Sequence, residues 1–518
     1  MKYKFILIVF LLWGTTQAAI KEAKPVTPKA SKEAAALLQF FYDISGKYTL
    51  TGQHNYPNTH SRNSEFYARY VGKTPTIYSS DMGFAEDGDT DSYLARPDIV
   101  QEAIKQHKAG ALVTLCWHAV PPTADEPVTF QPRPGVNNDG NLASVQGQLT
   151  DQQFKDVLTP GTELYKHWCK QVDAIAVFLK QLDEAHVPVL WRPYHEMNGG
   201  WFWWGGRTGE YSTKALYIQM YNRLVKHHKI KNLIWVWSVD RPNKPEMKFT
   251  NYYPGDEYVD ILALDVYGSD FNQAYYDSLN ALSHGKPMVL GEVGNPPELE
   301  ILAAQPRWSY WVIWAGMVRN TFRKKHQELV SDPRMLVMEK QSYWDLSAPY
   351  HQACGLTGLA EEWIVPAVFK AADFSGNWEF NEEQSVLGRF GAGMAPYKID
   401  VTQDDDEIKS VRTMIVEYGD DRVSDETIKL DGSEFQSNTS FRNSVRTSTA
   451  HWSAMGDTLT INSTMSFGGG DQARTINSTE VWTLDSNGRV LSITQSSESP
   501  WGKQETTLIY DRTCGPVD

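Results

Sequence analysis

Eight short apolar segments dominate the first two thirds of the chain, each followed by a loop and most by a helical stretch. They cover residues 48–52, 75–79, 111–116, 187–191, 233–237, 261–265, 288–291 and 311–314. Short apolar runs of this kind are typical of buried strands, and the stretches 167–182 and 215–226 between them have the periodicity of amphipathic helices. Eight such units over roughly 300 residues predict an α/β fold, a (β/α)8 TIM barrel. A doubly wound open sheet is the competitor, but it normally begins with a Gly-rich phosphate turn, and we find none early in the chain.

The sequence changes character at Phe374. Short alternating segments rich in Thr and Ser follow, about ten residues apart, which is typical of antiparallel strands. They include 410–416, 450–453, 457–463, 479–484, 490–495 and 505–510. This spacing predicts a small all-β domain, either a barrel or a sandwich. We therefore divide the chain into a barrel domain at 38–345, a connector at 346–372 and a β domain at 373–518.

The N-terminus has the pattern of a secretory signal peptide. Lys2 and Lys4 precede an apolar run that ends at Trp13, and residues 16–18 (TQA) follow as a cleavage site near Ala18. We expect residues 1–18 to be removed, residues 19–37 to form a disordered leader, and the protein to be secreted. The run is too short to cross a bilayer comfortably. Of the four cysteines, Cys354 and Cys514 flank the β domain and are the more attractive disulfide pair, whereas Cys116 and Cys169 fit buried thiols as well as a bridge.

Charge narrows the choice of partners. The formal net charge is −14, which disfavours nucleic acid and anionic membranes and fits a neutral substrate. We expect a monomer without membrane insertion, cofactor or metal. The acidic loop 87–91 has some features of a calcium loop, but Ser92 and Asp98 stand where an EF-hand needs Gly and Glu, so we interpret it as a solvated loop.

The segment 191–206 carries the densest chemistry in the chain. It reads WRPYHEMNGGWFWWGG and follows a predicted strand, so His195 and Glu196 are expected where that strand ends. In parallel barrels the C-terminal strand ends carry the chemistry. Aromatic faces pack on the C–H faces of sugars, and Arg, His and Asn bond hydroxyls, which indicates a carbohydrate site. The alternative is that the aromatic run 201–204 belongs to the core.

A second carboxylate stands at the end of the seventh predicted strand, where Glu292 follows Gly291. Glycoside hydrolysis needs two carboxyl groups, one to protonate the leaving oxygen and one to attack the anomeric carbon or to activate water. The fourth and seventh strands of an eight-stranded barrel lie on facing sides of its mouth. Glu196 and Glu292 are therefore the candidate catalytic pair.

With both carboxylates in place, the chain resembles glycoside hydrolase family 26 over roughly residues 38–345. The residues that carry the resemblance are 52–54 (GQH), 117–118 (WH), 192–199 (RPYHEMNG), 201–205 (WFWWG), 265–267 (DVY) and 291–292 (GE). The resemblance implies a secreted, retaining endo-β-1,4-mannanase with a (β/α)8 fold that acts on mannan, glucomannan or galactomannan. It implies Glu196 as general acid/base and Glu292 as nucleophile.

The resemblance also suggests roles for neighbouring residues, although structural roles for the two histidines and Trp314 remain alternatives. We expect His195 and His118 to bond the sugar in the −1 subsite, and Trp201 to form its aromatic floor. Tyr267 resembles the family's tyrosine that orients the nucleophile. The remaining substrate-site candidates are Trp314, as a second platform, and Arg192, which we expect to support the carboxylates from below.

Several functional alternatives stay open. A β-1,3-1,4-glucanase or a β-1,3-xylanase of the same family would share these motifs, and a carbohydrate-binding protein without activity would share the fold. Endo or exo action is equally open, and the long irregular segment 119–160 is the candidate to decide it. The opening 374–378 (FSGNW) of the β domain resembles lipocalin-like barrels, which leaves glycan binding, binding of a small hydrophobic molecule, or a stabilising role for that domain.

Overall fold

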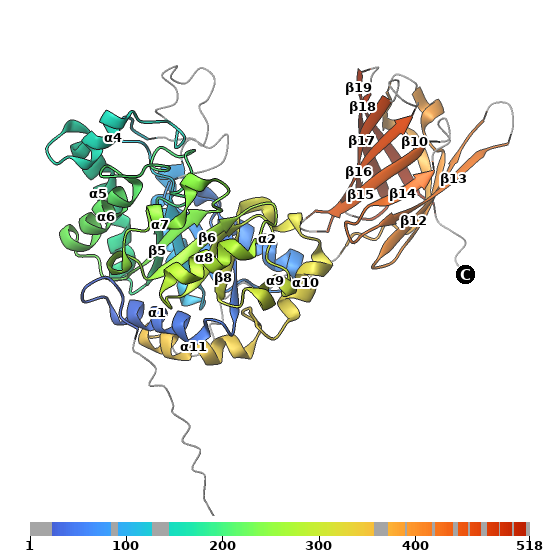
Figure 1. The fold of residues 1–518 in the computed structure, drawn as a ribbon. Helices are drawn as coiled ribbons and strands as arrows, with labels where there is room; N and C mark the ends of the chain where they lie inside the picture. The colour runs from blue at the N-terminus through green and yellow to red at the C-terminus, as the bar shows by residue number, and fades with distance from the viewer. Residues whose placement is uncertain are drawn as a thin grey trace, which may run out of the picture.

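The structure is a computed structural model that describes residues 23–83, 92–126, 144–356, 371–388, 391–416, 420–438, 444–453, 456–467, 474–485, 487–499 and 502–513. The predicted signal peptide, the acidic loop 87–91 and Cys514 lie outside these residues. Figure 1 shows a helix-covered barrel domain followed by a separate β domain.

The first domain is a closed barrel of eight parallel strands. The strands are β1 (Thr49–Asn55), β2 (Ile77–Asp81), β3 (Leu112–Trp117), β4 (Val189–Pro193), β5 (Leu233–Asp240), β6 (Ile261–Val266), β7 (Met288–Val293) and β8 (Trp308–Ile313). Each strand pairs with the next, and β1 pairs with both β2 and β8, which closes the barrel. A short strand β9 (Met335–Leu336) also pairs with β1. The predicted (β/α)8 fold and all eight predicted strands are confirmed.

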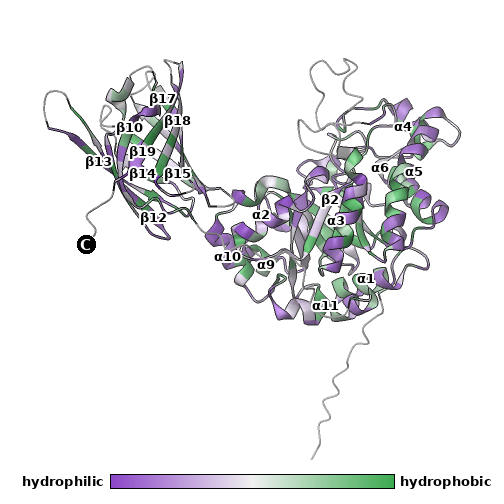
Figure 2. Cartoon of the chain, turned by 180° about the vertical axis from the view of Figure 1, so that it is seen from behind, coloured by the Kyte–Doolittle hydropathy of each residue, from purple (hydrophilic) through white to green (hydrophobic). Residues whose placement is uncertain are grey.

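Helices cover the outside of the barrel. They are α1 (Lys32–Ile44), α2 (Arg62–Val71), α3 (Arg96–Lys108), α4 (Asp151–Leu158), α5 (Glu163–Glu184), α6 (Thr213–Tyr221), α7 (Phe249–Tyr252), α8 (Gln273–Ser283), α9 (Leu299–Ala304), α10 (Arg323–Ser331) and α11 (Gln341–Ala353). Every residue of the eight strands is buried, which explains why they read as continuous apolar runs rather than alternating ones. Figure 2 shows hydrophobic strands inside and hydrophilic outer helix faces.

The barrel domain extends beyond both predicted boundaries. Residues 23–31, assigned above to a disordered leader, pack on the barrel: the backbone N–H of Val26 donates to Asp260 at 2.7 Å. Helix α1 then begins inside the predicted leader, because Ser31 caps its first turn. At the other end, Tyr343 and Tyr350 of α11 belong to the barrel core, so this helix continues the domain past residue 345.

The β domain is a single curved antiparallel sheet of ten strands. They are β10 (Gly376–Val386), β11 (Lys398–Gln403), β12 (Glu407–Met414), β13 (Arg422–Lys429), β14 (Phe435–Asn438), β15 (Val445–Trp452), β16 (Thr458–Phe467), β17 (Arg474–Leu484), β18 (Val490–Ser499) and β19 (Gly502–Arg512). The outermost strands β13 and β14 contact each other, so the sheet closes into a barrel-like domain rather than a sandwich. Its core contains Phe374, Trp378 and Trp482.

Two ion pairs lie inside the β domain. Arg412 on β12 donates two hydrogen bonds to Glu480 on β17, at 3.3 and 2.8 Å, and Arg446 on β15 pairs with Glu426 on β13. Burial by itself would raise the pKa of Glu480, but the positive charge of Arg412 outweighs it and holds this pKa at about 2. The Arg412–Glu480 pair therefore links β12 to β17, which are not neighbours in the sheet.

Replacing Glu480 with Gln is expected to destabilise the β domain by about 3 to 5 kcal/mol, because it leaves the Arg412 charge buried without its partner. The pKa of Glu480 is lower in the folded chain than its ordinary value of 4.5. The stability that this group contributes is thus present above pH 4.5 and is lost as the pH falls toward 2. Hydrogen exchange of peptides from β16 to β18 measures the effect. The matched control Glu505→Gln changes an exposed carboxylate of the same domain and should leave exchange unaltered. Equal protection in both variants would contradict the prediction.

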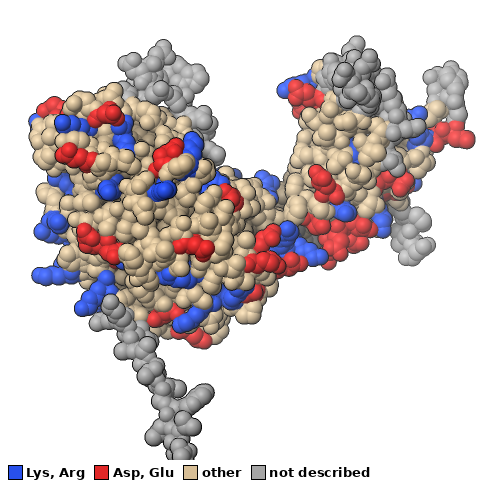
Figure 3. Space-filling view, viewed as in Figure 1, with Lys and Arg blue, Asp and Glu red and all other residues tan. Residues whose placement is uncertain are grey.

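The surface mixes both signs of charge. Figure 3 shows acidic and basic side chains interspersed over the visible face of the barrel domain. The acidic run 404–407 forms the turn between β11 and β12, where Asp404 accepts backbone hydrogen bonds from Asp406 and Glu407, as expected for a solvated turn. Among the helices in the described ranges, none is long and apolar enough to cross a membrane.

Cys354 is not paired with any cysteine of the described residues, and Cys514, its more attractive partner in the sequence, lies outside them. Cys354 follows helix α11, which packs on the barrel domain rather than on the β domain. Cys116 and Cys169 are free and buried, which is the thiol alternative considered above.

Candidate active site

Glu196 lies just beyond the end of β4, in a turn with unusual backbone geometry. Tyr194 and Glu196 both have positive φ angles, 51° and 50°, in a region that non-glycine residues avoid. The turn directs the Glu196 carboxylate to the mouth of the barrel, where Oε2 accepts a hydrogen bond of 2.6 Å from Trp201 Nε1. Strained backbone of this kind clusters at functional sites.

Glu292 lies near the end of β7, in contact with a cation and a phenol. Arg192 donates to its Oε1, and the Tyr267 hydroxyl donates to its Oε2 at 2.6 Å. Arg192 also bonds Asp265 at 3.0 Å and is itself buried. A side chain at Gly291 would place its Cβ 2.6 Å from Asp265, which explains why glycine precedes this glutamate. Arg192 pairs with Glu292 and Asp265, which is the position expected of a residue that supports the carboxylates from below. Its contact with substrate stays a prediction.

The two glutamates face each other across the barrel mouth. One carboxylate oxygen from each of Glu196, Asp265 and Glu292 lies within 4.8 Å of the other two. Burial raises the pKa of Glu196 well above its ordinary value, and the nearby charges of Glu292 and Asp265 raise it further. Glu292 instead has the guanidinium of Arg192 against it. The raised pKa of Glu196 is what a general acid requires.

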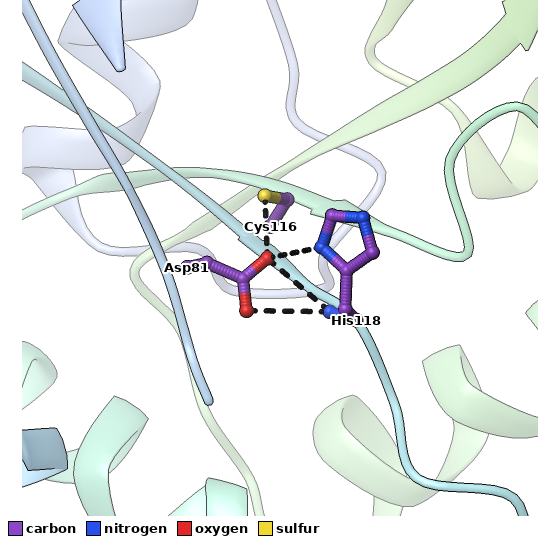
Figure 4. Close-up of side chains that lie close together, drawn as sticks. All are labelled: Asp81, Cys116 and His118. Atoms are coloured by element: carbon purple, nitrogen blue, oxygen red, sulfur yellow. Dashed lines mark hydrogen bonds and ion pairs between the residues drawn. The ribbon is translucent and has the colours of Figure 1, made fainter. Parts of the chain in front are cut away.

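Two histidines line the same mouth. Nε2 of His195 lies 3.1 Å from Nε2 of His118 and 3.7 Å from Oε1 of Glu292. Figure 4 shows how His118 is held: its Nδ1 donates to Asp81 at 2.7 Å, and the Cys116 thiol donates to the same carboxylate at 3.0 Å. Asp81 thus fixes the ring orientation of His118, and His118 in turn contacts His195. Burial lowers the pKa of His195 well below its usual value, so this ring is neutral.

The aromatic run after Glu196 divides between site and core. Trp201 is partly exposed and touches Glu196, as expected of a residue in the site. Phe202, Trp203 and Trp204 are buried, and the indole N–H groups of the two tryptophans bond the carbonyls of Ala119 and His195. The core alternative is therefore correct for three of the four residues. Trp314 follows β8 and stacks on His54, with ring centroids 4.0 Å apart.

Three clusters in the described residues have spacings compatible with a metal ion: Asp81–Cys116–His118, Asp173–His227–His228, and Glu196–Asp265–Glu292. In the first, the Cys116 thiol donates to Asp81, and burial raises the pKa of this thiol. In the second, Arg223 donates to both carboxylate oxygens of Asp173. In the third, Arg192 already provides positive charge between the carboxylates. All three sets have protein partners.

Sequence reasoning missed Asp81 and Ser238 as site residues, and Asp265 entered only through the family resemblance at 265–267, without a role. Asp81 ends β2, and Asp265 and Ser238 lie on β6 and β5. Ser238 bonds both oxygens of Asp265 and lies 3.3 Å from Arg192. Asp81 could have been predicted from the sequence, because it is a charged residue at the C-terminal end of a predicted strand, and that end carries the chemistry in this fold.

Comparison with known proteins agrees with this site. The sequence profile of glycosyl hydrolase family 26 matches residues 26–340, which is more than half of the chain. The chain belongs to glycoside hydrolase family 26. The match begins within the segment that packs ahead of α1 and ends just before α11, so it follows the barrel domain.

Curated relatives in the family include two mannan endo-1,4-beta-mannosidases. That of Thermothelomyces thermophilus is 34% identical over 301 residues, which cover 57% of each chain. That of Bacillus subtilis strain 168 is 29% identical over 315 residues, which cover 56% of this chain and 79% of the relative. The chain spans about half the length of the first curated relatives that it matches.

Solved structures of family 26 proteins are similar to this chain in fold. The structure of GH26A from a Muricauda species is 38% identical, with a TM-score of 0.54, and covers 60% of this chain and 98% of that one. The GH26-CBM35 beta-(1,4)-mannanase of Podospora anserina is 29% identical, with a TM-score of 0.52, and covers 62% and 70%. The family match at residues 26–340 includes both Glu196 and Glu292.

Proposed function

We propose that this chain is a secreted, retaining endo-β-1,4-mannanase that hydrolyses mannan, glucomannan or galactomannan. The observation that carries the proposal is how close the proposed catalytic pair lies: one carboxylate oxygen of Glu196 is no more than 4.8 Å from one carboxylate oxygen of Glu292. Retaining glycosidases keep their two carboxyl groups about 5 to 5.5 Å apart, whereas inverting enzymes leave about 6.5 to 9.5 Å for a water molecule. The mannanase relatives support the choice of substrate, and the signal-like N-terminus supports secretion.

In this mechanism Glu292 attacks the anomeric carbon while Glu196 protonates the leaving oxygen. The raised pKa of Glu196 keeps its proton available, and Arg192 and Tyr267 hold Glu292 in place for attack. Glu196, now ionised, then removes a proton from the water that releases the sugar. His118, His195, Trp201 and Trp314 surround the position of the −1 sugar.

The substrate experiment compares reducing-sugar release and product sizes on linear mannan, glucomannan, barley β-glucan and β-1,3-xylan. We expect cleavage of the first two into mixed oligosaccharides. A single disaccharide product would replace endo with exo action. Activity confined to β-glucan or xylan would overturn the substrate class, and no activity on any of the four would favour a binding protein.

Replacing Trp201 with Phe is expected to move the alkaline limb of the activity profile to higher pH. The indole N–H stabilises the Glu196 carboxylate and so lowers its pKa, and removing that donor raises the pKa again. Because the protonated acid is the active form, activity then persists to higher pH. The measurement is kcat/KM against pH. The control is Trp344→Phe. Trp344 lies on α11, and its indole N–H donates to the Met338 carbonyl rather than to a carboxylate of the site. A limb that stays in place or moves to lower pH would refute this role for Trp201.

A further inference from the structure

The β domain contains a cavity of about 490 Å³ between the inward faces of its strands. Ser410 and Arg412 on β12, Glu480 on β17 and Tyr510 on β19 line it. These residues alternate along their strands with outward-facing ones and share a face with the core residues Ile408 and Trp482. Apolar side chains therefore fill one part of the barrel interior and leave the other part open. The volume falls within the range of small-molecule sites.

The charged groups in this cavity balance. Arg412 and Arg446 provide two cations, and Glu480 and Glu426 provide two carboxylates. Each cation is paired with a carboxylate, with Arg446 also 3.8 Å from Glu480. A ligand with a net charge of either sign would meet groups of its own sign here. The cavity therefore favours a neutral molecule.

Three polar atoms in the cavity wall have no hydrogen-bond partner among the described residues. They are Ser410 Oγ, Arg412 Nε and Tyr510 OH. Ser410 and Tyr510 are completely buried. An unsatisfied buried polar group costs about 1 to 3 kcal/mol, and buried polar groups in native proteins are rarely left without a partner. All three belong to residues that line one cavity, but each atom has less than 1 Å² of exposed surface, so a ligand reaches them only when neighbouring side chains turn aside.

The wall offers donors and acceptors together. Burial raises the pKa of Tyr510, which therefore keeps its proton and donates, and Arg412 Nε donates as well. The carboxylates of Glu480 and Glu426 accept, and Ser410 can do both. A hydroxyl group is the ligand group that both donates and accepts. Toward the rest of the cavity the lining is also mostly polar, with Ser478, Gln495, Ser497, Gln504 and Thr506, while Met414, Met465, Ile493 and Leu508 provide apolar contacts.

We propose that the β domain binds a neutral, hydroxyl-rich molecule of one or two sugar units inside its barrel. The unpartnered Ser410, Arg412 and Tyr510 bond its hydroxyls. The site is separate from the barrel mouth that contains Glu196, and the inference does not depend on the activity proposed above. The mixed lining distinguishes this ligand from a long aliphatic molecule, which would leave the polar groups unsatisfied.

The test is hydrogen exchange of the full-length chain with mannobiose, cellobiose or xylobiose, compared with 1-decanol and decanoate. We expect at least one disaccharide to slow exchange in peptides from β12, β17 and β19. Tyr510→Phe should weaken this binding about tenfold, the effect of losing one hydrogen bond of 1.4 kcal/mol. Tyr397→Phe removes a hydroxyl that bonds Asp421 outside the cavity and should leave the affinity unchanged. Turnover by the barrel domain should be the same in both variants.

Three outcomes would overturn the proposal. In the first, disaccharides protect only peptides from the barrel mouth, or none. In the second, only 1-decanol or decanoate protects the β domain. In the third, Tyr510→Phe binds as tightly as the unaltered chain. If Tyr510→Phe does not fold, Ser478→Phe takes its place: it fills the cavity from β17 and should abolish binding while the unfolding transition remains.

Discussion

Replacing Glu292 with Ala is expected to reduce turnover of glucomannan on the order of 10⁴-fold or more, the size of effect seen when a nucleophile is removed. Without the carboxylate no covalent intermediate forms, whereas the surrounding residues still bind substrate. The space left by the side chain admits a small anion. Added azide should therefore attack an activated mannoside from the vacated side and give a product of inverted configuration. Product NMR measures this directly.

Glu298→Gln is the matched control for this prediction. Glu298 follows the same strand by a few residues, precedes α9, and is exposed, so its loss should leave turnover unchanged. Wild-type-like activity of Glu292→Ala would exclude the nucleophile assignment. An azide product of retained configuration would move that role away from Glu292.

Replacing Glu196 with Ala is expected to lower turnover of the polysaccharide by about 10² to 10⁴-fold, the usual contribution of a general acid. A mannoside with a dinitrophenyl leaving group needs no protonation, so its first step should stay fast. The second step lacks its base, and the glycosyl-enzyme should accumulate on Glu292. Intact-mass spectrometry would detect the added sugar. Azide should release it with retained configuration, because azide needs no base.

The two glutamate variants thus have opposite stereochemical outcomes with the same reagent. A chain in which Glu196 were the base of an inverting enzyme would accumulate no covalent species. Retained binding with lost turnover in both variants would also exclude a protein that only binds carbohydrate. Binding is measured separately, by calorimetry with mannan oligosaccharides.

The barrel was predictable from sequence because each strand is buried on both faces. Burial of this kind produces short, continuous apolar runs, and eight of them in a row leave few folds to consider. Glu292 could be found for the same reason, since a charged residue that ends an apolar run stands out. In the β domain, buried and exposed residues alternate along the strands. Strand β13 has mostly exposed residues, so its sequence has no apolar pattern strong enough to predict a strand. Strands β11 and β14 were missed as well.

What sequence could not provide was the partner of each polar group. Trp203 and Trp204 belong to the core because the carbonyls of Ala119 and His195 accept from their N–H groups. The Ala119 carbonyl comes from the loop after β3, and the His195 carbonyl from the start of the same loop as the tryptophans. Asp81 matters because β2 lies beside β3, which brings its carboxylate to His118. The N-terminal segment was assigned to a disordered leader from composition, but Asp260, far along the chain, satisfies the Val26 amide.

The positive φ angle at Glu196 has a consequence for how stability and activity are balanced in this protein. A glycine at 196 would adopt the same backbone without strain, which costs a non-glycine residue about 1 to 3 kcal/mol, and would remove a carboxyl group from a buried site. We therefore expect Glu196→Gly to melt at a higher temperature than the unaltered chain while having almost no activity. The residue that we propose as the general acid is thus one that selection for thermal stability alone would replace.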